Sequence, residues 1–331
     1  MKNTSNSPAI VVNYLQDKHL NIHVRDFLKR ENAHLKAVEA LSVEQARETL
    51  NVVQSISKID LSGVEVTNKT IDADGLSIQL NIVRPRGDDR LLPAFIFIHG
   101  GGWVMGSFAT HQRLVRDLVL GTGAVAVCID YSRSPEVKYP VALHEIYAAV
   151  KWVREKGVEL NVNGSSLAVV GDGAGANMAT ALCLMHLEKG DYALALQVLL
   201  WPVTEARFDA ESFVHFAMQR YLSTNKMKWM FDAYTLDAND RRNKLVSPLM
   251  ATGKELVGMP PALIVVAEND ILRDQGEHYG RKLRLAGVKA TTVRYNGMIH
   301  DFGLINTLSD IRPTKSMCLQ VSSELKKYLY I

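Results

Sequence analysis

The chain has few cysteines, no excess of charge of one sign and no long apolar run. Its three cysteines, Cys128, Cys183 and Cys318, lack metal-ligand or redox spacing, and the first two stand in apolar segments typical of buried, unreactive thiols. A formal net charge of +3 over 331 residues is too small to indicate a nucleic-acid or anionic-membrane partner. No segment approaches the roughly 18 apolar residues of a membrane span, and the N-terminus does not resemble a signal peptide. We therefore expect a soluble, cytoplasmic protein.

The sequence also lacks the signatures of a metal centre and of a nucleotide cofactor. Its ten histidines are scattered, with no His-Glu-x-x-His pattern and no Cys/His cluster. The glycines at 171, 173 and 175 superficially resemble a dinucleotide-binding loop, but Met178 stands where the third glycine of that fingerprint would fall. We expect neither a metal nor a cofactor.

Short apolar runs alternate with helical patterns over most of the chain. The apolar runs span residues 94–98, 124–129, 167–170, 193–200, 262–267 and 291–295. The helical patterns span residues 112–120, 141–155, 177–187, 275–286 and 315–330. Such an alternation is typical of a parallel sheet covered on both faces, which makes the fold class α/β. Ahead of these runs, residues 76–83 alternate apolar and polar side chains, which predicts a half-buried edge strand.

Two helical segments stand outside this alternation. Residues 1–60 carry apolar side chains at helical spacing, and residues 205–249 are helical, rich in aromatics and inserted between two core strands. We expect both to form a cap over the carboxyl ends of the strands, with residues 61–204 and 250–331 as the two parts of the core. The alternative for the aromatic residues is that they only fill the interior of the cap.

A glycine-rich loop follows the first apolar run. It reads His99-Gly100-Gly101-Gly102-Trp103, and successive glycines leave the backbone N–H groups unshielded and free to take unusual dihedrals. N–H groups aimed at one point stabilise the oxyanion of a tetrahedral intermediate by roughly 3 kcal/mol per donor. A glycine triplet alone is often only a loop, but its place after an apolar strand favours an oxyanion hole.

The segment 171–175 has the form of a nucleophile elbow without its nucleophile. In the pattern G-x-S-x-G, the serine stands on a sharp turn between a buried strand and a helix. Here an apolar run precedes Gly171, a helical pattern follows Gly175, and the middle position holds Gly173. Ser107 lies near the glycine loop, but nothing in the sequence places its hydroxyl on the elbow.

Asp270 and His300 follow two later strands. Asp270 comes directly after the run 262–267, and His300 lies in a loop after the run 291–295. A carboxylate at that point can hold an imidazole in one tautomer, although Asp270 can equally cap the helix that follows it. The chain order of elbow, aspartate and histidine is that of the α/β-hydrolases.

The motifs together resemble the hormone-sensitive-lipase-like esterases, which include bacterial acetyl esterases and arylacetamide deacetylases. The resemblance rests on residues 99–103, 130–136, 171–175, 268–274 and 300–302. It implies a hydrolase sheet of eight strands, a helical cap and a short-acyl carboxylesterase activity. It also implies that Gly101, Gly102 and the Ala174 amide form the oxyanion hole. In the same family, Asp270 would orient the imidazole of His300, and His300 would be the base. The segment 130–136 is structural in that family.

Three accounts of Gly173 remain open. The first is a carboxylic ester hydrolase of the Ser-Asp-His type, inactivated by glycine at the nucleophile position, whether natural or introduced. The second is a non-catalytic protein that binds a small molecule in the same pocket, but the retained pair of Asp270 and His300 has little purpose there. The third is hydrolysis by a water molecule that His300 activates in the space of the missing serine.

The expected pocket wall is apolar. We expect it to include Trp103, Met105, Tyr221, Trp229 and Phe302, which suits a small neutral ester as substrate or ligand. No lysine or arginine stands in a motif that would capture a carboxylate or a phosphate. A homodimer is possible, and nothing in the sequence decides it.

Overall fold

A single eight-stranded sheet organises the chain. The computed structural model describes residues 13–34, 37–192 and 194–330. The strands are β1 (Val64–Ala73), β2 (Leu76–Pro85), β3 (Leu92–Ile98), β4 (Val125–Asp130), β5 (Val162–Asp172), β6 (Gln197–Leu200), β7 (Ala262–Asn269) and β8 (Ala290–Ile299). They lie in the order β1-β2-β4-β3-β5-β6-β7-β8, and only β2 runs against the others. The predicted fold class, an α/β-hydrolase fold with a mostly parallel sheet of about eight strands flanked by helices, is confirmed.

One predicted strand takes a different place in the sheet. Residues 76–83 form part of β2, as the alternation predicts, but β2 lies between β1 and β4 and is not an edge strand. The edge on that side is β1, which pairs with β2 along its whole length through a tight turn. The expectation of an edge strand was wrong because β1 carries mostly exposed polar side chains and gives little apolar signal of its own.

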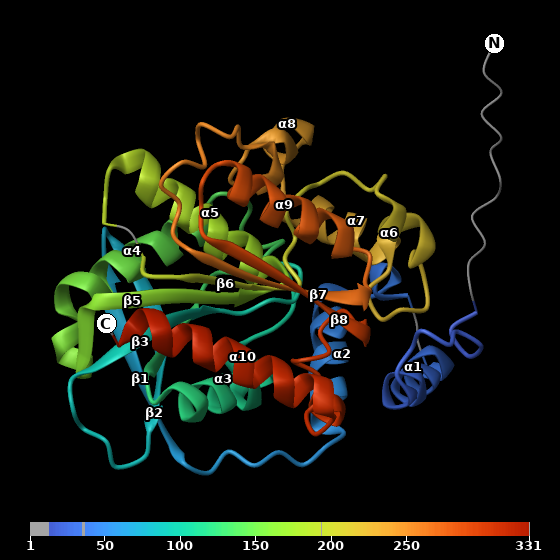
Figure 1. The fold of residues 1–331 in the computed structure, drawn as a ribbon, viewed down its shortest axis with the longest axis horizontal. Helices are drawn as coiled ribbons and strands as arrows, with labels where there is room; N and C mark the ends of the chain where they lie inside the picture. The colour runs from blue at the N-terminus through green and yellow to red at the C-terminus, as the bar shows by residue number, and fades with distance from the viewer. Residues whose placement is uncertain (1–12, 35–36, 193, 331) are drawn as a thin grey trace.

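Helices cover both faces of the sheet (Figure 1). On one face lie α3 (Phe108–Thr122) and α10 (Arg312–Leu329), and on the other α4 (Val141–Lys156), α5 (Ala174–Lys189) and α9 (Arg273–Leu285). The remaining helical elements are α1 (Ile22–His34), η1 (Val38–Ala40), α2 (Val43–Ser55), η2 (Gly157–Leu160), α6 (Glu211–His215), α7 (Thr224–Tyr234), α8 (Ala238–Arg242), η3 (Pro248–Met250) and η4 (Asn306–Leu308). In Figure 1, α1, α2, α6 and α7 gather at the end of the molecule toward which the arrows of β7 and β8 point.

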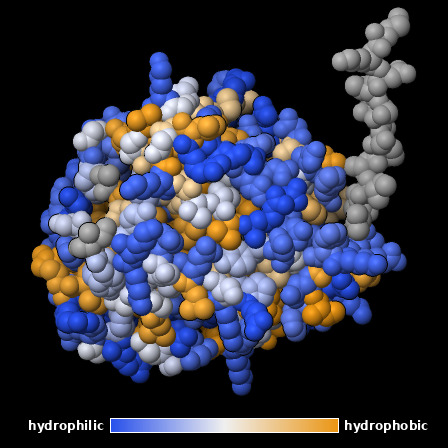
Figure 2. All heavy atoms as spheres, viewed as in Figure 1, coloured by the Kyte–Doolittle hydropathy of each residue, from blue (hydrophilic) through white to orange (hydrophobic). Residues whose placement is uncertain are grey.

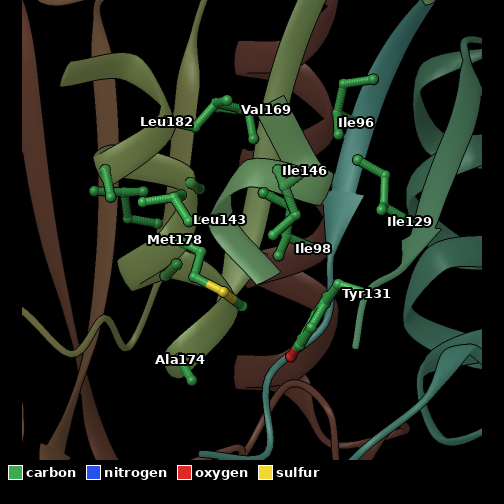
Figure 3. Close-up of a cluster of buried hydrophobic side chains, with 14 of the residues drawn as sticks. Ile96, Ile98, Ile129, Tyr131, Leu143, Ile146, Val169, Ala174, Met178 and Leu182 are labelled. Atoms are coloured by element: carbon green, nitrogen blue, oxygen red, sulfur yellow. The ribbon is translucent and has the colours of Figure 1, made fainter. Parts of the chain in front are cut away.

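Alternate side chains of the central strands serve two separate cores. In β3, Ile96 and Ile98 belong to the cluster that α4 and α5 cover, whereas Phe95 and Phe97 belong to the cluster that α3 and α10 cover. Figure 3 shows the first cluster, with Ala174 at the start of α5 near its edge. Because both faces are buried, β3 is apolar at every position, as the sequence predicted. The visible surface, by contrast, mixes polar and apolar residues without a large apolar patch (Figure 2).

Candidate active site

The elbow is a tight turn between β5 and α5. Gly173 has φ of +50° and ψ of −113° and stands at the N-terminus of α5. The turn brings backbones into contact, since a Cβ on Gly175 would lie 1.9 Å from the carbonyl oxygen of Ile98, and one on Gly171 would lie 2.4 Å from the Gly175 backbone. Glycine at these two flanking positions is therefore required by space.

Gly173 itself is not required by space. A Cβ placed there would meet only the imidazole of His300, with Nε2 at 3.6 Å and Cε1 at 3.8 Å, which is ordinary van der Waals contact. Its positive φ disfavours any side chain, but this is a matter of backbone strain and not of collision. The elbow thus has room for the side chain that the pattern lacks.

His300 is held by Asp270. Nδ1 of His300 lies 2.8 Å from Oδ2 of Asp270, and both side chains are buried. The other carboxylate oxygen of Asp270 accepts a hydrogen bond from the backbone N–H of Leu272 at 2.9 Å. Asp270 therefore contacts the imidazole and also bonds to the turn that leads into α9. It does not cap that helix, because the N-cap residue of α9 is Leu272 and no side chain caps it.

A second carboxylate faces the free nitrogen of the imidazole. Oδ1 of Asp301 lies 3.4 Å from Nε2 of His300, the nitrogen that also faces Gly173. Burial would lower the pKa of His300, but the charges of Asp270 and Asp301 outweigh it and raise that pKa to about 9. Burial in turn raises the pKa of the Asp301 carboxyl, against the effect of His300.

The glycine loop faces the same space. Gly101 and Gly102 have positive φ, and a Cβ on Gly102 would lie 2.1 Å from Sδ of Met230. Within the described part of the chain, the backbone N–H groups of Gly101 and Gly102 donate no hydrogen bond to a backbone carbonyl. Both residues line one cavity together with Gly173, Ala174 and His300. The N–H groups of the loop are thus available to a molecule in that cavity.

Buried polar residues fasten the loop to the elbow. Oδ1 of Asp172 accepts a hydrogen bond from the backbone N–H of Gly100 at 3.0 Å, and its Oδ2 lies 3.3 Å from Nε2 of His111. The hydroxyl of Tyr131 donates to the carbonyl of His99 at 2.8 Å, and the two rings stack at 4.3 Å. These contacts fix the loop relative to the turn that carries Gly173.

The segment 130–136 connects the loop to the N-terminal helices. Arg47 of α2 makes two hydrogen bonds to the carboxylate of Glu136, at 2.8 and 2.7 Å, and a third to the carbonyl of Val104 at 2.9 Å. The pKa of Glu136 falls to about 2 because of the Arg47 guanidinium. This bidentate pair ties α2 to the loop that carries Gly101 and Gly102.

The cavity has residues from all these parts in its wall. It is lined by Glu31, Val38, Thr49, Leu50, Val53, Gly101, Gly102, Met105, Gly173, Ala174, Val203, Tyr221, Leu222, Lys226, Met227, Met230, Leu272, His300 and Asp301. The charged groups Glu31, Lys226 and Asp301 were not expected there. No sequence motif marks Glu31 or Lys226. Lys226 lies four residues before Met230 and so on the same face of α7, but Met230 was not expected in the cavity either.

The expected pocket wall is only partly the one in the structure. Met105 and Tyr221 line the cavity, whereas Trp103, Trp229 and Phe302 are not among its lining residues. Trp103 is fully buried behind the loop, where it stacks on Tyr234 at 4.3 Å between ring centres. Phe302 is buried too and packs against Trp201. Their sequence neighbours face the cavity, but their own side chains point into the core.

Other candidate chemistry finds no support in the described part of the chain. Within residues 13–34, 37–192 and 194–330, no group of three or more His, Cys, Asp or Glu side chains is placed to hold a metal ion. Over the same residues, no helix is long and apolar enough to cross a membrane. Ser107 is the N-cap residue of α3 and is absent from the cavity lining. Cys128 and Cys183 are buried, and burial raises the pKa of both thiols.

Known proteins share this fold and much of this sequence. A family model for the alpha/beta hydrolase fold matches residues 95–304. A protein of Acanthamoeba polyphaga mimivirus, named as an alpha/beta hydrolase, is 35% identical over 296 residues, which are 88% of this chain and 84% of that protein. The carboxylesterase NlhH of Mycobacterium tuberculosis is 32% identical over 78% of this chain and 82% of its own.

A solved structure is closer still. The thermostable esterase from Pseudomonas putida ECU1011 superposes with a TM-score of 0.94 and 49% identity, over 95% of this chain and 99% of that chain. The matched family model covers more than half of the chain, and esterases recur among its relatives. The chain therefore belongs to the α/β-hydrolase family, in the hormone-sensitive-lipase-like branch of carboxylesterases.

Proposed function

We propose that this site is built to hydrolyse a carboxylic ester by a Ser-Asp-His mechanism, and that the chain is inactive or nearly so because position 173 is glycine. One observation carries the proposal. The imidazole of His300 stands 3.6 Å from the point where a Cβ of residue 173 would lie, while Asp270 holds its far side at 2.8 Å. A base and its orienting carboxylate are in place around a nucleophile position that lacks only its side chain.

The remaining residues have roles that follow from this arrangement. A serine at position 173 would give its proton to His300 Nε2 as its oxygen attacks the ester carbonyl. The N–H groups of Gly101, Gly102 and Ala174 would then stabilise the negative charge that develops on the carbonyl oxygen. His300 would return the proton to the leaving alcohol, and water would later release the acid by the same route. Asp270 keeps the imidazole in the tautomer that both steps need.

We also propose that residues 1–60 and 205–249 form a cap over the site; of these, residues 1–12 and 35–36 lie outside the described part of the chain. Glu31, Leu50 and Val53 from the first segment and Tyr221 and Met227 from the second line the cavity, which supports this assignment. The bidentate pair of Arg47 with Glu136 would keep the first segment in register with the glycine loop. Homodimer formation stays a prediction.

A second candidate is a small-molecule binding protein on the same scaffold. The observation in its favour is that a cavity is present beside position 173 although no nucleophile stands there. Against it, the intact contact between Asp270 and His300 serves proton transfer and is not needed to hold a neutral ligand.

The two candidates differ in what a serine at position 173 does. We expect Gly173→Ser to raise kcat/KM for p-nitrophenyl acetate and butyrate by roughly five to six orders of magnitude, the scale on which removal of a triad nucleophile lowers activity. Gly173→Ala is the matched control, since it adds the Cβ without the hydroxyl, and it should stay inactive. A folded serine variant without activity would favour the binding protein.

A further inference from the structure

One charged side chain in the cavity is unused by the proposed mechanism. Lys226 lies in the first turn of α7, where its backbone N–H donates to the side chain of the N-cap residue Ser223 at 3.1 Å. Its side chain lines the same cavity as Gly173 and His300. Helical spacing puts it on one face with Met230, which also lines the cavity, so the helix presents a cation to the site between apolar neighbours.

Among the residues that the structure describes, the ammonium of Lys226 has no ion-pair partner, since no carboxylate oxygen lies within 4.0 Å of its Nζ. Its one contact of note is with the ring of Tyr221, whose centre is 5.0 Å away. Burial lowers the pKa of Lys226, and the more distant Asp301 and Glu31 oppose that effect. A partly buried ammonium without an adjacent anion is in a costly position, which an anionic ligand would relieve.

The carboxylates of the cavity do not fill this gap. Asp301 lies 3.4 Å from Nε2 of His300 and so faces the imidazole. Glu31 has an interaction of its own. Because Asp270 and Asp301 both lie beside His300, Lys226 is the cation of the cavity wall that a ligand can neutralise.

We propose that Lys226 is an anion subsite and that the cavity takes esters which carry a carboxylate. This inference rests on the proposed function and replaces the neutral ester that the sequence favoured. The ester carbonyl would face the N–H groups of Gly101 and Gly102, and the carboxylate would reach the ammonium of Lys226 on the opposite, cap side of the cavity. A charge-assisted hydrogen bond in a poorly hydrated pocket changes affinity by roughly tenfold or more.

The chain with Gly173 allows a binding test without turnover, because it cannot form an acyl-enzyme at position 173. Monoethyl glutarate carries the carboxylate on the acyl side, and 4-acetoxybutanoate carries it on the alcohol side. Their uncharged counterparts are ethyl pentanoate and 4-acetoxybutanamide. Isothermal titration at low salt should show at least one charged ester binding about tenfold more tightly than its counterpart, and which of the two does so identifies the side that bears the charge.

Two variants make the result specific to Lys226. Lys226→Met should abolish the preference, so that each charged ester binds no more tightly than its uncharged counterpart. Lys228→Met, an exposed lysine on the same helix, is the matched control and should retain the preference. The proposal is overturned if the uncharged esters bind as tightly as the charged ones, if no ester binds, or if Lys226→Met, folded by circular dichroism, keeps the preference.

The same variant separates this inference from the proposed function. In the Gly173→Ser background, Lys226→Met should lower kcat/KM for the preferred charged ester about tenfold more than it lowers kcat/KM for the uncharged counterpart of that ester. If Gly173→Ser is inactive but the chain with Gly173 binds charged esters through Lys226, the hydrolase proposal fails and the anion subsite stands. If Gly173→Ser is active and shows no preference for charge, the anion subsite fails alone.

Discussion

The backbone at the elbow predicts that a side chain at position 173 lowers stability. Gly173 has φ of +50°, where a residue with a Cβ is strained by roughly 1–3 kcal/mol. The added Cβ causes no collision, because its nearest neighbour, Nε2 of His300, would be 3.6 Å away. Gly173→Ala should therefore show the strain alone, as a thermal midpoint lower by roughly 1–4 °C, since about 1 kcal/mol shifts the midpoint of a protein of this size by roughly 1–2 °C.

Gly173→Ser should lose less stability than Gly173→Ala. Its hydroxyl can hydrogen-bond to the imidazole of His300, and such a bond offsets roughly 1 kcal/mol of the strain. Differential scanning calorimetry of the chain with Gly173 and of both variants in one buffer measures the three midpoints directly. We expect the highest midpoint for the chain with Gly173, a lower one for the serine variant and the lowest for the alanine variant. Midpoints for both variants at or above that of the chain with Gly173 would show that the backbone is not strained at this position.

Three further predictions concern the charges around the imidazole. In the Gly173→Ser background, Asp301→Asn should move the ascending limb of the pH–rate profile to lower pH, because it removes one of the two carboxylates that raise the pKa of His300; an unmoved limb would contradict this. In the same background, Asp270→Asn should lower kcat by about 10⁴-fold through loss of the correct tautomer, and retention of most activity would rule out its orienting role. In the chain with Gly173, the pKa of His300 is raised from 6.5 to about 9. The charge of His300 should therefore stabilise the fold fully below pH 6.5, and this stabilisation should be lost as the pH rises through 9. The loss is on the order of 3 kcal/mol, so the free energy of unfolding, measured with urea, should decline less steeply between these pH values in His300→Gln; an equally steep decline would contradict the prediction.

The parts of the site that lie within short sequence motifs could be predicted. The elbow glycines, the glycine loop, Asp270 and His300 each directly follow a strand, and parallel strands bring their carboxyl ends to one edge of the sheet. The structure accordingly has His300 beside both Asp270 and Gly173. The order of the motifs along the chain was enough to predict this proximity, because the parallel topology brings the strand ends together.

The parts that depend on long-range packing could not be predicted. Trp103 is next to the glycine loop in sequence, yet its ring turns into the core because Tyr234, far along the chain, offers a stacking partner. Lys226 has no motif around it, and it reaches the cavity only because α7 folds over the strand ends. The alternating pattern of β2 could not reveal the polar strand β1 that covers its edge. Each of these depends on a contact between distant segments, which local pattern does not encode.

We propose that every element of an esterase site except the nucleophile is present around position 173. Intact-mass spectrometry of the Gly173→Ser variant after incubation with a fluorophosphonate tests this, because a serine oxygen displaces fluoride from phosphorus only when a base and an oxyanion hole assist it. We predict one adduct per chain, located on the peptide that contains position 173, and none on the chain with Gly173. A folded serine variant that remains unlabelled would contradict the proposal.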